Sequence, residues 1–166
     1  MSDPSGAGRV DRYRVVPAAY VLLLRTEPDG TDSLLLQLRA RTGFMDGHWA
    51  CGAAGHVEAG ESVLDAAVRE GREELGVRVA AGDLLPLTAM HRTRRTGLAV
   101  DERVDFFLAC RTWVGEPRLL EDKADDLRWV RLDALDSLGE PIVPHERHVL
   151  DALAAGTLPA VITFGF

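Results

Sequence analysis

The sequence has few of the residues that build disulfide frameworks or thiolate metal sites. Only two cysteines occur, Cys51 and Cys110, and neither belongs to a CxxC pair. Their number and spacing exclude a disulfide framework and a thiolate zinc site. Because free cysteine behaves as a small apolar residue, we expect both thiols to lie in the core.

Long apolar runs and an excess of basic residues are also absent. The longest apolar stretches, such as residues 18–24, are too short to span a bilayer, and no basic segment precedes an apolar core at the N-terminus. The formal net charge of −7 excludes general electrostatic attraction to nucleic acid or to an anionic membrane. We therefore expect a cytoplasmic protein that has neither as a partner.

What is present suits one domain with a hydrophobic core, since 46% of the 166 residues are hydrophobic. Residues 1–11 are small and polar without any period, which predicts a flexible leader. No internal repeat or low-complexity linker is visible, so residues 12–166 are expected to form a single domain.

Apolar runs separated by turn residues predict most of the regular structure. Residues 18–24 and 33–38 flank a Pro-Asp-Gly turn and predict a β-hairpin. Further strands are expected at residues 85–91, 103–110 and 127–132. A helix is expected over residues 144–155, with proline in its first turn and glycine after its end. The apolar tail, residues 158–166, predicts an edge strand or a surface that packs on a second copy, so a homodimer is a hypothesis.

The most informative stretch is residues 55–77, which begins as a loop and continues as a helix. Ser62, followed three residues later by an aspartate, predicts the helix start, and Gly76 predicts its left-handed end. Spacings of three and four predict an apolar stripe that packs on a sheet, made of Leu64, Ala67, Val68, Gly71 and Leu75. Gly71 is expected to bring two backbones close together.

A different face of this helix is expected to carry Glu70, Glu73 and Glu74, which are neighbours at i, i+3 and i+4. Each like-charged pair costs roughly a few tenths of a kcal/mol in an isolated helix, so stability alone does not select them. One interpretation is a solvated surface that nearby arginines neutralise. The other is a site for a hard divalent cation that bridges to phosphate oxygens. The small residues 52–55 favour the second, because they let the backbone approach a bulky anion.

Residues 55–77 also resemble the Nudix box, G-x5-E-x7-R-E-U-x-E-E-x-G-U, in which U is a bulky apolar residue. Gly71 departs from the motif at the first U, a change that removes no chemical group. The other defined positions match, namely Gly55, Glu61, Arg69, Glu70, Glu73, Glu74, Gly76 and Val77. The sequence is thus similar to Nudix hydrolases of the MutT-like type.

This resemblance implies an α/β fold, the α/β/α sandwich of the family, with a mixed β-sheet and a loop–helix–loop catalytic motif. It implies that Glu70, Glu73 and Glu74, together with Gly55, bind Mg²⁺, with Mn²⁺ as a substitute. The implied activity is hydrolysis of the phosphoanhydride bond of a nucleoside di- or triphosphate, or of a related nucleoside diphosphate linked to another group. A metal-activated water would attack phosphorus.

The resemblance also implies supporting residues. Arg69 would orient the glutamates, and Glu61 would support them from the loop. A further carboxylate from a later loop, as metal ligand or general base, aligns with Glu121. Other acidic residues nearby remain alternatives, namely Glu116, Asp122, Asp125 and Asp126.

Substrate contacts are expected from residues outside the box. His91 and Arg92 come at the end of the third predicted strand and would meet phosphates, unless they form an exposed basic hairpin tip. His145 aligns with an asparagine that reads the base in the oxidised-purine triphosphatases of the family. The alternative is that His145 or His148 caps or decorates the last helix. The chain lacks that asparagine, so the resemblance does not extend to oxidised-guanine selectivity.

Two alternatives stay open. The Gly-His-Val-Glu-Ala-Gly-Glu-Ser segment also resembles isopentenyl-diphosphate isomerases, whose protonating cysteine would directly precede the Gly-His pair. Ala54 stands there, and Cys51 lies three residues earlier. The second alternative is a non-catalytic, nucleotide-binding Nudix sensor, although such modules tend to lose box glutamates and this chain has all of them.

Overall fold

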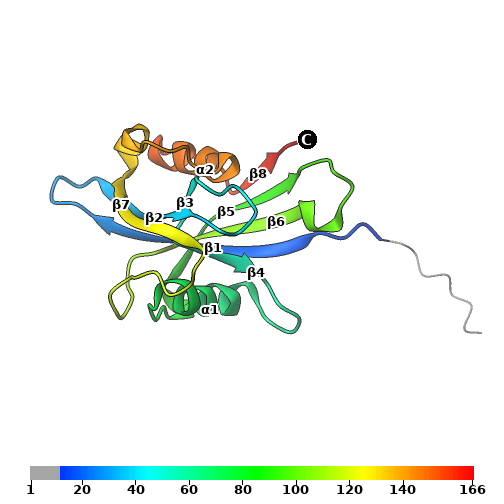
Figure 1. Cartoon of the computed structure of the whole chain (residues 1–166), viewed down its shortest axis with the longest axis horizontal. Helices are drawn as coiled ribbons and strands as arrows, with labels where there is room; N and C mark the ends of the chain where they lie inside the picture. Colours follow the sequence, from blue (N-terminus) through cyan, green and yellow to red (C-terminus); the bar gives the residue numbers. More distant parts are fainter. Residues whose placement is uncertain (1–11) are drawn as a thin grey trace, which may run out of the picture.

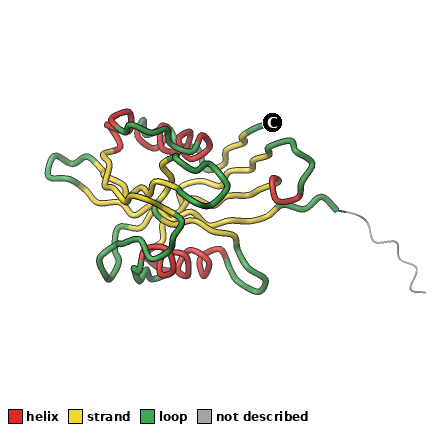
Figure 2. The backbone as a smooth tube through the Cα atoms, in the orientation of Figure 1, coloured by secondary structure: helices red, strands yellow, loops and turns green. Residues whose placement is uncertain are grey.

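The molecule is built in three layers, with a mixed β-sheet between two helices (Figures 1 and 2). The computed structural model describes residues 12–166. Helix α1, Val63–Leu75, covers one face of the sheet, and helix α2, Pro144–Ala154, covers the other. This confirms the predicted α/β/α sandwich. The predicted leader, residues 1–11, lies outside the described residues.

The strands follow one another in the order β1 to β8 along the chain. They are Val16–Thr26 (β1), Asp32–Arg39 (β2), Trp49–Cys51 (β3), Ala53–His56 (β4), Leu84–Thr93 (β5), Glu102–Cys110 (β6), Ala124–Arg131 (β7) and Val161–Phe164 (β8). Short 3-10 helices span Ala81–Asp83 (η1), Ala99–Asp101 (η2) and Leu132–Ser137 (η3).

The sheet runs in the order β3-β2-β1-β6-β5-β8, while β4 pairs with β1 and β7 pairs with β2. The β1–β6 and β5–β8 pairs are parallel, and the other pairs are antiparallel. The predicted hairpin, the three later strands and helix α2 are confirmed. The tail forms the edge strand β8, whereas the homodimer stays a prediction. Strands β3 and β4 were missed, because segments of three and four residues show no readable period.

Helix α1 begins and ends as its sequence predicts. Ser62 and Asp65 form a capping box at its start, and Gly76 adopts the left-handed conformation at its end, with φ 69°. The predicted apolar stripe is wrong at Leu64, which is exposed. The buried face instead contains Ala66, Ala67, Glu70, Gly71, Glu74 and Leu75, so Glu70 and Glu74 lie within it and only Glu73 of the three glutamates is exposed.

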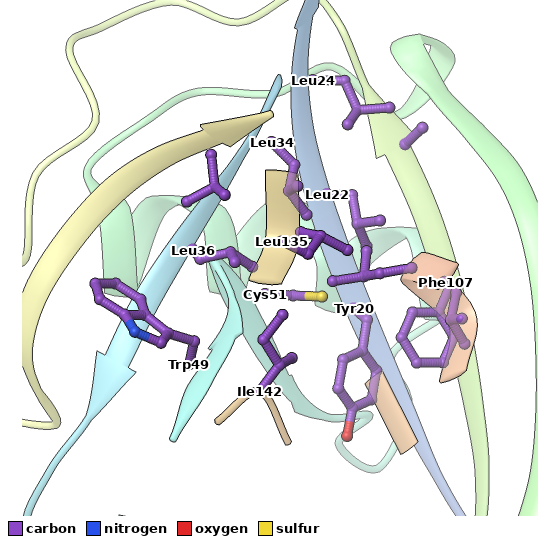
Figure 3. Packing of buried hydrophobic residues seen from close by; sticks show 14 of the residues in the cluster. Tyr20, Leu22, Leu24, Leu34, Leu36, Trp49, Cys51, Phe107, Leu135 and Ile142 are labelled. Carbon is purple, nitrogen blue, oxygen red and sulfur yellow. The ribbon is translucent and has the colours of Figure 1, made fainter. Parts of the chain in front are cut away.

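The two faces of the sheet each carry a hydrophobic core. Alternate residues of β1 point to opposite faces, so Tyr20 and Leu22 pack with α2 residues such as Val149, while Ala19 and Val21 pack with α1. Figure 3 shows the α2-side core, where the Tyr20 and Phe107 rings stack and the Tyr20 hydroxyl points away from the apolar cluster.

Cys51 and Cys110 are both buried and free, as predicted. In residues 12–166, none of the helices is long and apolar enough to cross a membrane.

Candidate active site

Gly55 on β4 and Glu70 on α1 meet at the centre of the candidate site. A side chain on Gly55 would overlap the Glu70 carboxylate, so this approach requires glycine. Gly71, by contrast, has room, because a Cβ there would lie 3.7 Å from the Val77 and Val79 side chains. The predicted close approach at Gly71 is therefore wrong, and the tight contact belongs to Gly55.

Arg69 lies between several carboxylates. Its Nε and Nη2 donate to the two oxygens of Glu61, at 2.8 and 3.1 Å. Its Nη1 donates to Glu70 Oε1 at 2.5 Å and to Glu73 Oε2 at 3.2 Å. Nη2 also donates to the His56 carbonyl at 3.0 Å. One guanidinium group thus holds three carboxylates, and this Arg69 cluster keeps an excess of negative charge.

Glu74 lies one turn further along the buried face of α1. The Ala54 backbone N–H donates to Glu74 Oε2 at 3.0 Å, and Gln37 Nε2 lies 3.4 Å from the same oxygen. Burial raises the pKa of the Glu74 carboxyl to about 7, and the negative charges of Glu70 and Glu121 add to this shift. Burial likewise raises the pKa of Glu70. Both groups therefore bind protons more tightly than exposed glutamates do.

Glu121 reaches the site on the segment that follows β6. The backbone N–H groups of Arg118 and Leu120 donate to the Leu75 and Glu74 carbonyls, at 3.0 and 3.1 Å, which ties this segment to the end of α1. The ammonium group of Lys123, the only lysine of the chain, lies 2.6 Å from Glu121 Oε2. Glu121, and more weakly Glu74 and Glu70, raise the pKa of Lys123, so this cation lies in the field of the carboxylates.

The donor set suits a divalent cation. Glu70 Oε2 and Glu74 Oε1 accept no hydrogen bond from residues 12–166, and hard carboxylate oxygens in a negative environment are the ligands that Mg²⁺ and Ca²⁺ prefer. Over the same residues, no three His, Cys, Asp or Glu side chains stand in a ready metal-binding geometry. Arg69 donates to Glu61, Glu70 and Glu73, and Lys123 pairs with Glu121, so two protein cations partly neutralise the site.

A pocket of about 440 Å³ opens beside Gly55 and His56. Its walls include Tyr20 on β1, Arg103 on β6 and Glu146 on α2, so it lies on the face of the sheet that α2 covers. A smaller pocket of about 80 Å³ shares Phe44, Arg92 and Arg94 with it. The carboxylates of α1 and the larger pocket are thus adjacent across β4.

The predicted substrate residues end up in different places. Arg92 is buried and lines both pockets. His91 points to the other face of β5, as the strand period requires; it packs on the Phe166 ring, with centroids 4.7 Å apart, and lines neither pocket. The structure therefore does not bring His91 to the site.

His145 lines the smaller pocket and is buried. Its Nε2 lies 3.2 Å from the Tyr20 hydroxyl, and burial lowers its pKa to about 3, helped by nearby arginines. The N-cap residue of α2 is Val143, without a side-chain cap. The alternative that His145 caps or decorates the helix is therefore wrong.

Several residues of the site were not predicted from the sequence. Gln37 and Lys123 contact the carboxylates, and Arg39, Arg103 and Glu146 line the larger pocket. They come from distant parts of the chain, so spacing carried no signal for them. A usable signal was Asp105, an acidic residue directly before the apolar end of strand β6, because a buried carboxylate requires cationic partners.

Comparison with known proteins identifies the family of the chain. Residues 15–153 match the family model for the NUDIX domain. The NAD-capped RNA hydrolase NudC of Pseudomonas aeruginosa is 33% identical over 146 residues, covering 86% of this chain and 45% of that protein. The chain thus spans about half the length of this curated relative. The uncharacterized Nudix hydrolase YvcI of Bacillus subtilis is 27% identical over 125 residues, covering 75% of this chain and 73% of that protein.

Solved structures agree with this comparison. The MutT NUDIX hydrolase from Burkholderia pseudomallei has a TM-score of 0.68 and 27% identity, covering 83% of this chain and 97% of that chain. The NUDIX domain of Shewanella oneidensis NrtR, solved with ADP ribose, has a TM-score of 0.66 at 15% identity, covering 86% and 88%, and shows the fold alone. Nudix hydrolases cleave nucleoside-diphosphate-linked compounds and generally use divalent metal ions. The chain belongs to the Nudix family.

Proposed function

We propose that the protein uses Mg²⁺, for which Mn²⁺ substitutes, to hydrolyse the phosphoanhydride bond of a nucleoside di- or triphosphate or a nucleoside-diphosphate derivative. One observation carries the proposal: the buried carboxylates Glu70 and Glu74 lie against β4, whose Gly55 and His56 also line the large pocket. Metal ligands and substrate pocket are thereby adjacent. When bound, the metal supplies charge neutralisation and a water of lowered pKa.

The residues around the site have different roles in metal binding. Glu70 and Glu74, with Gly55 and the exposed Glu73, hold the metal. Arg69 orients Glu70 and Glu73 through the hydrogen bonds of its Nη1. Glu61 in turn anchors Arg69 by accepting from both Nε and Nη2.

Glu121 is the general base of the proposed hydrolysis. Asp122 and Asp125 pair with Arg41, and Asp126 pairs with Arg128. Glu121 pairs instead with Lys123, a cation on which Glu74 and Glu70 also act. Glu116 is exposed. Among the acidic residues of this loop, Glu121 is the one whose charge acts on Glu74, and it would accept the proton of the attacking water.

The structure disfavours the isomerase alternative. Cys51 is fully buried, and its backbone N–H donates to Glu146 Oε2 at 2.5 Å. Burial raises the pKa of the Cys51 thiol well above its usual value, so the sulfur is held as a structural thiol on the α2 side. The sensor alternative predicts ligand binding without turnover.

The partner is a small nucleotide-type molecule, and the absence of nucleic acid as a partner stays a prediction. A relative named as an NAD-capped RNA hydrolase makes capped RNA and dinucleotides necessary members of any substrate panel. The single domain over residues 12–166 and the cytoplasmic location are likewise part of the proposal.

The test is a panel of nucleoside triphosphates, dinucleotides, nucleotide sugars and NAD-capped RNA, assayed with Mg²⁺, Mn²⁺ or EDTA. We expect metal-dependent release of a nucleoside monophosphate, and a loss of about 100-fold or more in Glu74→Gln, beyond what an outer-shell residue contributes. Turnover that survives EDTA, or an equally active Glu74→Gln, overturns the proposal.

A matched pair of glycine variants tests whether activity depends on the contact between Gly55 and Glu70. Gly55→Ala places a methyl group on the Glu70 carboxylate, whereas the Cβ of Gly82→Ala meets nothing within 4 Å. We expect Gly55→Ala to lose activity as strongly as Glu74→Gln and Gly82→Ala to keep it. Equal activity of the two alanine variants would place the chemistry away from Glu70.

A further inference from the structure

A second ion cluster lies in the large pocket, with the opposite balance of charge. Arg92 on β5 and Arg103 on β6 stand directly opposite each other in the antiparallel ladder. Like charges at such positions repel. Asp105 is the carboxylate between them: its Oδ2 pairs with Arg92 Nε, and its Oδ1 lies 3.4 Å from Arg103 Nε. This Asp105 cluster therefore has two cations for one anion.

The Asp105 cluster is desolvated but incompletely bonded. Asp105 is 0% exposed and Arg92 is 5% exposed. Both Asp105 Oδ1 and Arg103 Nε are buried without a hydrogen bond. Arg103 Nη1 instead reaches His56 Nε2, at 2.6 Å, at the edge of the α1 carboxylate site. Buried polar atoms without partners are costly, so the stability of the sheet does not account for this arrangement.

Arg39 adds to the positive excess. It donates to the Thr42 hydroxyl and the Phe44 carbonyl, and no carboxylate of residues 12–166 pairs with it. Arg94, the remaining arginine of the pocket, is balanced by Asp101.

The other titratable groups of the pocket do little to offset this positive charge. The pKa of the buried Glu146 carboxyl is raised by burial, which favours its neutral form. The pKa of His145 is lowered first by burial and then by Arg92, Arg103 and Arg39. In a chain of net charge −7, this pocket therefore holds uncompensated positive charge.

We infer that Arg39, Arg92 and Arg103 form an anion subsite that binds a phosphate group of the substrate other than the two joined by the scissile bond. Asp105 is a positioning residue that holds Arg92 and Arg103. The inference rests on the proposed function, because the scissile diphosphate is assigned to the metal at α1. The strand order β4-β1-β6 separates β4 from Arg103's strand by about 10 Å, two strand spacings.

The substrate class follows from the charge. Guanidinium groups match phosphate oxygens in geometry and remain charged at any working pH. A nucleoside triphosphate, or a dinucleotide that carries an additional phosphate monoester, supplies the third phosphate. A nucleoside diphosphate or an unmodified dinucleotide does not, and we expect it to be a poorer substrate.

The first experiment measures binding without catalysis. Inorganic phosphate is added to the full chain in EDTA at constant ionic strength, and the shift in the thermal midpoint is recorded. We expect a phosphate-dependent rise in wild type that is lost in Arg39→Gln and Arg103→Gln. Arg111→Gln is the matched control, because Arg111, like Arg103, is paired with one aspartate, Asp32, but lines neither pocket. Equal shifts in all four proteins overturn the inference.

The second experiment compares substrates that differ by one phosphate, ATP with ADP and NADP⁺ with NAD⁺. We expect kcat/KM to favour the member with the extra phosphate by about tenfold or more in at least one pair, the value of one charge-assisted hydrogen bond. Arg39→Gln leaves no carboxylate unpaired and should remove this preference. Arg111→Gln should keep it. Equal cleavage within both pairs overturns the inference. Phosphate binding without hydrolysis of any compound supports the subsite and instead overturns the proposed function.

Discussion

The Arg69 cluster and the Asp105 cluster lie on opposite faces of one sheet and have opposite charge balance. At Arg69, one cation meets the carboxylates of Glu61, Glu70 and Glu73, whereas at Asp105 one carboxylate meets two guanidinium groups. Strand β4 lies between them, with Gly55 against Glu70 and His56 against Arg103. Buried charge that the protein leaves unbalanced is costly, so each cluster indicates a ligand of the missing sign: a cation for the first and an anion for the second.

The largest expected effect is on the Asp105 cluster. Asp105→Asn leaves Arg92 and Arg103 without a counter-charge, and we expect the free energy of unfolding to fall by about 3 to 5 kcal/mol. Urea denaturation measures this change. Asp32→Asn removes a more exposed partner of an arginine and should cost no more than about 1 kcal/mol. If both variants cost the same, Asp105 behaves as a solvated residue and the contrast between the clusters fails.

The next effect is that Glu74 and His145 make the free energy of unfolding depend on pH in opposite directions. Glu74 has a folded pKa of about 7, above the usual carboxyl value, so the folded state binds the extra proton between about pH 4.5 and 7. Its contribution to the free energy of unfolding falls as pH rises through this window, by about 3 kcal/mol at most. His145, with a folded pKa of about 3, binds fewer protons when folded, so its contribution rises between about pH 3 and 6.5.

Comparing variants separates the contributions of Glu74 and His145 to the free energy of unfolding. Urea denaturation of metal-free wild type, Glu74→Gln and His145→Gln is measured across this range. The free energy of unfolding of wild type minus that of Glu74→Gln should fall as pH rises. The same difference taken with His145→Gln should rise. Differences of the same sign would show that burial does not favour both the protonated form of Glu74 and the neutral form of His145.

A smaller effect is expected from the metal. A cation that binds only the folded state at ten times its dissociation constant adds about 1.4 kcal/mol to the free energy of unfolding. We expect Mg²⁺ to stabilise wild type and Asp32→Asn to this extent and to leave Glu74→Gln unchanged, measured by thermal unfolding at constant ionic strength. Equal stabilisation of all three proteins would assign the ion to another surface.

The smallest effect concerns Gly71, where the chain departs from the family motif. A Cβ there makes ordinary contacts at 3.7 Å with Val77 and Val79. We expect Gly71→Ala to raise the free energy of unfolding by about 0.5 to 1 kcal/mol, because alanine loses less conformational entropy in a helix. Activity should stay unchanged. A destabilised Gly71→Ala variant would mean that the Arg69 cluster depends on close packing here.

Much of the fold was readable from local signals. The Ser62 cap, the Gly76 end and the Pro-Asp-Gly hairpin follow from backbone chemistry that acts within a few residues, and the structure confirms them. Arg69 meets Glu73 because a helix brings residues four apart onto one side, and it meets Glu61 because the preceding loop folds back. Strands β3 and β4 escaped prediction because they are too short to show a period.

The errors share one cause, which is that helical spacing does not say which face is covered. Leu64 and Ala67 fit the same apolar period, but the sheet covers Ala66 and Ala67 and leaves Leu64 exposed. His91 and Arg92 are neighbours in sequence, yet the strand period sends them to opposite faces of β5. Only Arg92 therefore reaches the pocket.

By itself, the sequence determined the family, the helix that carries the glutamates and the kind of ligand they suit, because the motif has a fixed spacing on one continuous segment. The tertiary structure decided the charge balance. Burial against β4 raises the pKa of Glu74 to about 7, and the pairing of β5 with β6 sets Arg92 opposite Arg103. Desolvation and cross-strand proximity depend on residues far apart in the chain, and a single sequence does not specify which of them meet.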